Sequence, residues 1–320
     1  MLLRMADLAA GHGPDRRAVL AGLGAAVAAL LLRTRPVHAA VPVFRRRVGA
    51  VEVAVVSDGA LVVPLSFSLP QVPPAETAAF LTAHGLPPGG SPIATNVSLV
   101  SAGDELTLVD AGSGANFQPT AGKLADNLEA AGIAPAKIAK VVFTHGHADH
   151  LWGAIDDFDD SERFPNASYV ISAQEWDFWT DPDTHTRVPD WLKGMARGSA
   201  RVLKRLEGKV ERRRAGEEVV PGVSFVETGG HTPGHMSVLV ESGGDRLLIG
   251  ADALSHPAVS FARPDWRWGS DYDSDRAVAT RRRLLDRLAT ERTALIGFHL
   301  PWPGHGMVER SGTAYRFVAL

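Results

Sequence analysis

The decapeptide Thr-His-Gly-His-Ala-Asp-His-Leu-Trp-Gly, residues 144–153, constrains this 320-residue chain more than any other stretch. It follows residues 140–143, an apolar run that predicts a buried strand. Three imidazoles and one carboxylate therefore crowd together just past a strand end. That arrangement is unfavourable unless a divalent cation binds between them. The decapeptide predicts a metal site.

Three further candidate ligands lie downstream, and each closes an apolar run that predicts a strand. They are His231, Asp252 and His299. His299 is preferred to His305 because it stands directly at the strand end. His235 is expected to support a ligand rather than bind metal. The chain has no cysteine, so nitrogen and oxygen must hold the metal. Zinc is the expected ion, and manganese, cobalt and iron stay open.

Residues 1–40 predict an export signal rather than part of the fold. Arg16 and Arg17 precede an apolar stretch, residues 18–32, and small residues follow at 37–40. This pattern is typical of a cleaved twin-arginine signal. A membrane anchor is the alternative, but about 15 apolar residues fall short of the roughly 20 that span a bilayer. We expect a periplasmic or secreted hydrolase domain over residues 41–320, without stable membrane insertion.

The composition indicates an ordinary globular protein, with 45% hydrophobic residues and a net charge of −3. That charge gives no electrostatic basis for binding nucleic acid. A small-molecule substrate is expected, and a homodimer stays open.

The order of predicted elements is strands first, then strand–helix–strand. Residues 51–56 and 61–63 predict a hairpin around Asp58 and Gly59. A helix is expected over 119–131. Residues 70–90, rich in Pro, Ala and Gly, are expected to carry a short helix and to fold over the site.

Two stretches resemble each other and suggest two similar halves. Residues 103–110 and 244–252 each contain a Gly-Asp turn, an apolar strand and an aspartate at the strand end, Asp110 or Asp252. Asp110 is interpreted either as a support that orients a ligand histidine or as a turn former.

The set His145-x-His147-x-Asp149-His150 with His231, Asp252 and His299 resembles the metallo-β-lactamase superfamily. The resemblance implies an α/β fold, a four-layer αβ/βα sandwich with two metal ions at the loop ends. It implies that His145, His147 and His231 hold one ion, that Asp149, His150 and His299 hold the other, and that Asp252 bridges them. True β-lactamases use Cys or Ser in the second site, so β-lactam hydrolysis is not expected.

Within that superfamily the chain is similar to the methyl parathion hydrolase branch, through residues 110–114, 232–235, 250–254 and 297–301. The metal shell of that branch resembles that of the N-acyl-homoserine lactonases. Its substrates include organophosphotriesters, aryl esters and lactones, and its leaving-group pocket is aromatic. Phe117, Trp176 and Trp179 are the pocket residues expected here.

The expected chemistry is hydrolysis. Two divalent ions about 3.5–4 Å apart lower the pKa of a shared water towards about 7, which supplies a nucleophile at neutral pH. Asp149 and Asp252 are the expected catalytic carboxylates. Two alternatives stay open: a single-iron relative that acts on thioesters or sulfur compounds, and a periplasmic metal-binding protein without turnover.

Overall fold

The computed structural model describes residues 42–103 and 105–320. The predicted export signal, residues 1–40, lies outside the described residues. None of the helices within the described ranges has the length and hydropathy that a membrane-spanning helix needs.

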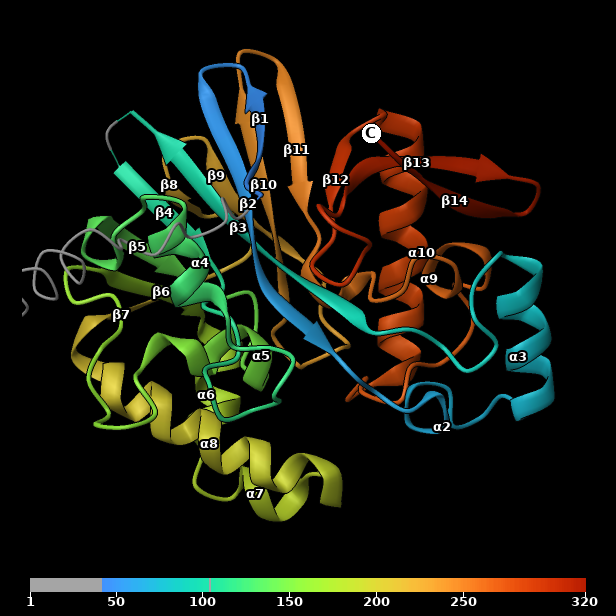
Figure 1. Ribbon diagram of the computed structural model, residues 1–320, viewed down its shortest axis with the longest axis horizontal. Coiled ribbons are helices and arrows are strands. Elements are labelled where there is room, and N and C mark those ends of the chain that lie inside the picture. Colours follow the sequence, from blue (N-terminus) through green and yellow to red (C-terminus); the bar gives the residue numbers. More distant parts are fainter. Residues whose placement is uncertain (1–41, 104) are drawn as a thin grey trace, which may run out of the picture. The chain divides into compact units, whose positions relative to one another are not determined.

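Two seven-stranded sheets form the centre of the domain (Figure 1). The first has the strand order β1 to β7, and the second has the order β14 to β8. The strands of the first sheet are β1 Phe44–Val48, β2 Val51–Leu61, β3 Ile93–Ala102, β4 Glu105–Val109, β5 Ile138–Val142, β6 Ser168–Ser172 and β7 Val210–Arg213. Those of the second are β8 Glu218–Val220, β9 Val223–Glu227, β10 Met236–Ser242, β11 Asp245–Ile249, β12 Ala294–Ile296, β13 His305–Ser311 and β14 Ala314–Ala319.

Strand residues alternate between two hydrophobic cores. In β2, Val53 and Val55 belong to the core between the sheets, whereas Ala54 and Val56 belong to the core under the helices. This is the two-residue period of an extended chain with both faces buried. It explains why the strands are almost continuously apolar in sequence.

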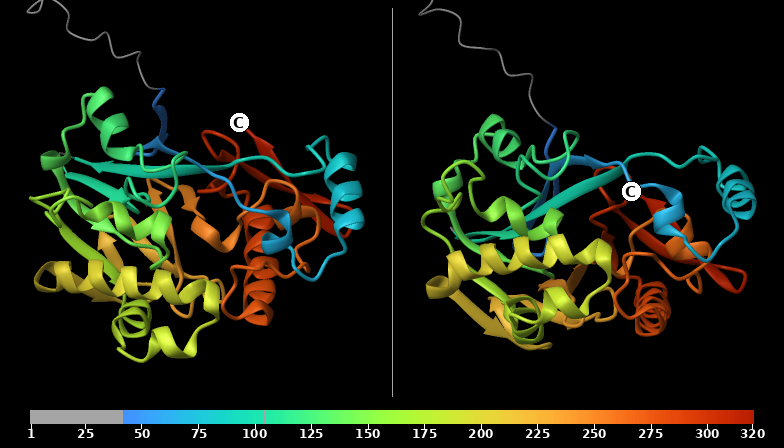
Figure 2. Two further views of the ribbon diagram at one scale, coloured as in Figure 1. Left: turned by 60° about the horizontal axis from the view of Figure 1, so that its bottom comes forward. Right: turned by 90° about the horizontal axis from the view of Figure 1, so that it is seen from below.

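Helices cover the outer face of each sheet. Over the first lie α4 Leu124–Ala130, α5 Ala148–Leu151, α6 Ala173–Thr180, α7 Thr184–Arg187 and α8 Asp190–Leu206. Over the second lie α9 Val259–Ala262 and α10 Ser274–Glu291, and Figure 2 shows these helices on the two sides of the sheets. The predicted mixed α/β sandwich, with four layers in the order helices, sheet, sheet, helices, is confirmed.

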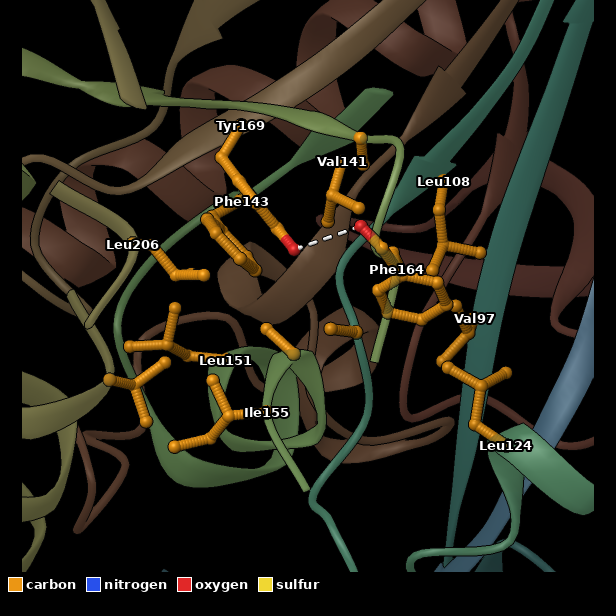
Figure 3. Packing of buried hydrophobic residues seen from close by; sticks show 14 of the residues in the cluster. Val97, Leu108, Leu124, Val141, Phe143, Leu151, Ile155, Phe164, Tyr169 and Leu206 are labelled. Carbon is orange, nitrogen blue, oxygen red and sulfur yellow. Dashed lines mark hydrogen bonds between the residues drawn. The ribbon is translucent and has the colours of Figure 1, made fainter. Parts of the chain in front are cut away.

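Large side chains fill the core under the helices of the first sheet. Phe143, directly after β5, stacks on Tyr169 of β6 with ring centroids 5.8 Å apart. The Tyr169 hydroxyl donates to the carbonyl of Phe164, as Figure 3 shows, so its buried oxygen is not left unpaired. Leu151 of α5 packs into the same cluster and anchors the helix that follows the histidine motif.

The hairpin predicted around Asp58 and Gly59 is wrong. Strand β2 runs through both residues and pairs with β3 on either side, with a bulge between Ser57 and Gly59. Gly59 has φ +110°, and a Cβ there would lie 2.3 Å from the carbonyl oxygen of Thr120. The Asp-Gly pair therefore marks a bulge rather than a turn.

The segment between β2 and β3 carries α2 Leu65–Ser68 and α3 Pro74–Ala83. Helix α3 agrees with the short helix expected there. Near the C-terminus, the hairpin of β13 and β14 was not predicted. The helix expected over 119–131 is shorter, because the chain becomes helical only at Leu124.

Candidate metal centre

The ligand loops all leave strands or turns at the same edge of the two sheets. His145 follows β5 by three residues, and His299 follows β12 by three. His147 is the N-cap residue of α5, and Asp149 and His150 lie in that one-turn helix. Asp149 and His150 are neighbours on this turn, and His145 and His147 directly precede it. Four of the predicted ligands therefore come from six consecutive residues.

The first group comprises His145, His147, His231 and Asp252, whose ligand atoms all lie within 4.8 Å of one another. His147 Nδ1 is 3.1 Å from His145 Nε2 and 2.9 Å from His231 Nε2. Asp252 Oδ2 is 3.2 Å from His231 Nε2. All four side chains are buried.

The second group comprises Asp149, His150 and His299, again within 4.8 Å of one another. Asp149 Oδ2 is 3.3 Å from His299 Nε2 and 3.5 Å from His150 Nε2. Asp252 also reaches this group, with Oδ1 3.2 Å from His150 Nε2. Asp252 is thus the carboxylate in contact with both groups.

The atoms of these groups fit a pair of divalent metal ions. His150 Nε2 and Asp252 Oδ1 are buried and have no hydrogen-bond partner among the described residues. Such atoms are costly unless something binds them, and a cation between the two groups would satisfy both. Five imidazoles and two carboxylates form a donor set that suits zinc.

Hydrogen bonds behind several of the histidines fix which ring nitrogen faces the centre. Asp110 accepts from His150 Nδ1 at 2.8 Å, and it also accepts the backbone N–H of Thr144 at 2.8 Å. The carbonyl of Ala94 accepts from His299 Nδ1 at 2.9 Å. Asp110 therefore lies where the sequence-based support role requires it.

His235 lies beside the first group without belonging to it. Its Nε2 accepts the backbone N–H of Asp252 at 3.2 Å, and its Nδ1 is 2.8 Å from Thr228 Oγ1. Burial lowers the pKa of His235 to about 3, so the ring stays neutral and keeps accepting. The structure thus places His235 behind Asp252 and outside the two ligand groups.

The charges of the centre favour metal binding at neutral pH. Burial holds the pKa of His145 and of His147 well below the usual value, so both rings are neutral. Burial opposes ionisation of Asp252, but His299 and His150 hold its pKa well below its usual range. Burial opposes protonation of His231 and His299, but contacts with Asp252 and the neighbouring aspartates raise the pKa of His231 to about 9 and that of His299 to about 10, and the same carboxylates raise the pKa of His150. The ionised carboxylates therefore attract a cation, which displaces protons from these three rings when it binds.

A cavity of about 240 Å³ opens onto the centre, where His147, Asp149, His231, Asp252 and His299 form its polar end. The rest of its lining is mainly apolar. The larger apolar side chains are Leu61, Val63, Phe67, Ile93, Phe117, Trp191, Met195 and Trp268.

Of the three predicted pocket residues, the structure places only Phe117 in the cavity wall. Trp179 is fully buried behind the centre, with its ring 5.7 Å from that of His147. Trp176 packs against the core and lies under the guanidinium of Arg212. Both are on α6, whose position behind the histidine loop keeps them from the cavity.

Residues 61–68 form the wall expected from residues 70–90. The latter segment contributes nothing to the cavity lining. Instead Phe80 of α3 packs on Trp266 and Val259, away from the metal centre. The proline and glycine content of 70–90 indicates an irregular segment but not which side of the molecule it covers.

Sequence reasoning missed Asp271 and its partner. Asp271 accepts from His231 Nδ1 at 3.0 Å, and buried Arg281 of α10 donates to its other oxygen at 3.1 Å. No strand ends at Asp271, so the strand-end pattern that located the ligands could not find it.

Comparison with known proteins agrees with this geometry. The family model described as the metallo-beta-lactamase superfamily matches residues 90–299. An N-acyl homoserine lactonase of Bacillus cereus is 25% identical over 172 residues, which cover 54% of this chain and 60% of that protein.

Two solved structures are similar over most of the chain. AidC, described as a dizinc quorum-quenching lactonase in complex with a product, has a TM-score of 0.81 and 27% identity. The hydrolase AbOPH of the beta lactamase superfamily has a TM-score of 0.80 and 25% identity. Each match covers 87% of this chain and 97% of the solved one. With the fold, the ligand set and these matches together, the chain belongs to the metallo-β-lactamase superfamily of hydrolases.

Proposed function

We propose that this protein is an exported, dinuclear metal-dependent hydrolase that opens lactones with apolar acyl chains. The single observation that carries the proposal is the cavity, polar where it meets five of the seven predicted ligands and mainly apolar elsewhere. An N-acyl-homoserine lactone has the matching chemistry, with a polar ring at one end and a hydrocarbon chain at the other. The lactonase names of two similar proteins support this substrate class.

The side chains divide the work of hydrolysis. Two divalent ions bound by the two groups supply Lewis-acid polarisation and water activation at neutral pH. Asp149, which borders the cavity and contacts His299, is placed to accept a proton from the attacking water and return it to the leaving oxygen. Asp252 fixes the spacing of the two groups. Trp191 and Phe67, with ring centroids 5.3 Å apart, hold the apolar part of the substrate.

A second candidate is hydrolysis of aryl esters and organophosphotriesters, the substrates of the methyl parathion hydrolase branch. The aromatic rings of Phe67, Phe117 and Trp191 in the wall favour it, because a flat aryl leaving group packs well on rings. The two candidates share the metal centre and differ in the reacting atom, a carbonyl carbon or a phosphorus, and in what fills the apolar end.

A turnover panel on the zinc-loaded protein tests the proposal. It compares N-hexanoyl- and N-decanoyl-homoserine lactone, an aryl acetate and a dialkyl aryl phosphate. We expect the lactones to give the highest kcat/KM. Metal analysis of the protein as purified, before zinc is added, should give two divalent ions per chain. One iron per chain would favour the single-iron relative, and two ions without turnover of any substrate would favour the metal-binding protein.

The export route has its own test, because residues 1–40 decide it alone. Changing Arg16 and Arg17 together to lysine should keep the protein in the cytoplasm, while the parent chain reaches the periplasm. If the variant and the parent chain reached the periplasm in the same proportion, twin-arginine export would be contradicted.

A further inference from the structure

We infer that Glu175 is a positioning residue that ties the two ligand loops of the first group together and thereby sets the affinity for one of the two metal ions. The inference rests on the dinuclear centre proposed above. Glu175 does not touch the ligand atoms or the cavity. It acts on the backbone that carries the ligands.

Glu175 lies at the first turn of α6, in a sequence that normally serves only its own helix. Residues 172–175 read Ser-Ala-Gln-Glu, and Ser172 accepts the backbone N–H of Glu175 at 3.1 Å as the helix N-cap. In a capping box the glutamate would reach back to the N-cap N–H. Here its carboxylate is fully buried and accepts hydrogen bonds from outside α6.

Both oxygens of Glu175 accept hydrogen bonds from the ligand loops. Oε2 accepts the N–H of Gly146, between His145 and His147, at 3.0 Å. Oε1 accepts the N–H of Gly234, three residues after His231, at 2.8 Å. One carboxylate therefore joins the segments that carry all three histidines of the first group, although they are some 85 residues apart in the chain.

The remaining contacts leave this carboxylate little freedom. Trp179 Nε1 donates to Oε2 at 2.5 Å. A Cβ on Gly146 would lie 2.3 Å from that indole nitrogen, and a Cβ on Gly234 would lie 2.6 Å from the backbone nitrogen of Glu175. Glycine at both positions allows the loops to approach the carboxylate. This explains why Trp179 is buried behind His147 rather than placed in the pocket.

The other sides of the same peptides are also held. Ser199 of α8 donates to the carbonyl of Gly146 at 2.6 Å, and Ser172 Oγ donates to the carbonyl of Gly234 at 2.7 Å. Residues 145–150 carry ligands of both groups, but Glu175 accepts no hydrogen bond from the loop of His299 among the described residues. Asp110 holds His150 through its ring and also accepts the backbone N–H of Thr144, and the His299 ring is held by the carbonyl of Ala94. Loss of Glu175 should therefore act unequally on the two ions.

The test is chelator competition on the full, zinc-loaded chain, with the zinc that remains per chain measured by atomic emission. In Glu175→Gln an amide N–H₂ replaces one acceptor oxygen and faces backbone donors. In a chelator titration each zinc ion leaves in its own step, and one step should occur at about 10- to 100-fold lower chelator concentration than in the parent chain. The other step should stay within about threefold. His299→Ala, which leaves the first group complete, identifies the first-group step. Ser199→Ala should move the same step by a smaller factor.

Asp58→Asn is the matched control. Asp58 is also a buried carboxylate that accepts several backbone N–H groups, those of Ser113, Gly122 and Leu124, but none belongs to a first-group loop. It should lower the thermal unfolding midpoint and leave the first-group step in place.

The outcomes separate this inference from the function on which it rests. A parent chain that binds no zinc would overturn both. A parent that binds two ions, with equal shifts of both steps in Glu175→Gln, with no shift, or with the same shift in Asp58→Asn, would overturn the role of Glu175 alone. If Glu175→Gln does not fold, an unchanged first-group step in Ser199→Ala would overturn it instead.

Discussion

The two halves of the domain share one plan and use it differently. In each, a hairpin is followed by a parallel strand: β3, β4 and β5 in the first half, and β10, β11 and β12 in the second. Asp110 N–H donates to the carbonyl of Val142, and Gly250 N–H donates to that of Ile296. His145 and His299 each lie three residues beyond those carbonyls, so the halves place one histidine ligand at equivalent positions.

After that histidine the halves diverge. The first half turns into α5 and adds His147, Asp149 and His150 from the same loop. The second half turns away into β13, and its other ligands, His231 and Asp252, come from separate loops. The ligands of the first half are therefore close together in sequence, whereas those of the second half are far apart in sequence and are brought together by the fold.

The aspartates of the two halves are not equivalent, although the sequence match paired them. The hydrogen bonds align Asp110 with Gly250, so Asp252 corresponds to Gly112. Asp110 lies behind the ligands and orients His150, whereas Asp252 contacts both groups. A displacement of two residues thus separates a supporting carboxylate from a bridging one.

The largest expected effect comes from removing the bridging aspartate. Asp252→Ala takes away the carboxylate that contacts histidines of both ligand groups. We expect the loss of at least one zinc per chain and a fall in kcat/KM of roughly 1,000-fold or more, about 4 kcal/mol of transition-state stabilisation. Metal analysis and lactone turnover measure the two effects. Two retained ions with full activity would contradict the bridging role.

Removing the charge of Asp110, the supporting carboxylate of the first half, should reduce zinc binding and activity less than Asp252→Ala does. Asp110→Asn keeps an oxygen that can accept from His150 but loses the charge behind it, so zinc affinity should fall by about 10- to 100-fold. At saturating zinc two ions should still bind and much of the activity should return. A loss as large as that of Asp252→Ala, unrecovered by zinc, would erase the distinction between the two aspartates.

The pocket wall draws on both halves, and its first-half side can be tested through Trp191. Trp191→Ala should raise KM for N-decanoyl-homoserine lactone about tenfold, or about 1.4 kcal/mol. The hexanoyl substrate should change less and kcat little, because the ring contributes uniform binding. Steady-state kinetics with both substrates decide this. An equal KM change for the two chain lengths would argue against acyl-chain binding at this ring.

A smaller effect is expected on the pH dependence of the free energy of unfolding, through His256 in a loop of the second half. The first-half loop is held by the carboxylate of Asp58, whereas in the second half His256 Nδ1 accepts the N–H groups of Ala258 and Val259, each at 3.1 Å. Burial, followed by the nearby charge of His84, lowers the pKa of His256 to about 4 from 6.5. Below pH 6.5 the unfolded chain binds this proton and the folded chain does not, so the histidine destabilises the fold as pH falls towards 4.

Between pH 6.5 and 5 this linkage corresponds to about 2 kcal/mol. His256→Asn keeps an acceptor for the loop and should remove that part of the pH dependence. Urea unfolding of metal-free parent and variant at pH 7 and pH 5 gives the difference. Parallel pH dependence in both proteins would contradict the neutral state of His256.

Most of the fold could be predicted, because its signals are local. The apolar run of β2, and the leucines at 284, 285 and 288 of α10, show directly in the sequence. The bulge at Gly59 did not, because an Asp-Gly pair favours a turn and only the register with β3 decides otherwise.

The seven predicted ligands, which the structure brings together in two groups, could be selected from the sequence because all of them follow strands or share one short motif. The pocket could not, because its walls depend on which loops cross the site. Phe67 and Trp268 lie in segments with no periodic signal. Trp179 lies outside the cavity because its indole N–H donates to buried Glu175. Asp271 is visible only through the histidine it supports.

The short connection that continues from β2 borders the cavity, so substitutions in it can change which substrates bind. Val62, Val63 and Phe67 border the cavity and belong to neither ligand group. The connection is fastened at one end by the pairing of Leu61 with Ile93 and at its middle by Gln118, which accepts the N–H of Val62. A library of substitutions confined to these three positions should retune what the protein accepts while leaving its reactive machinery intact.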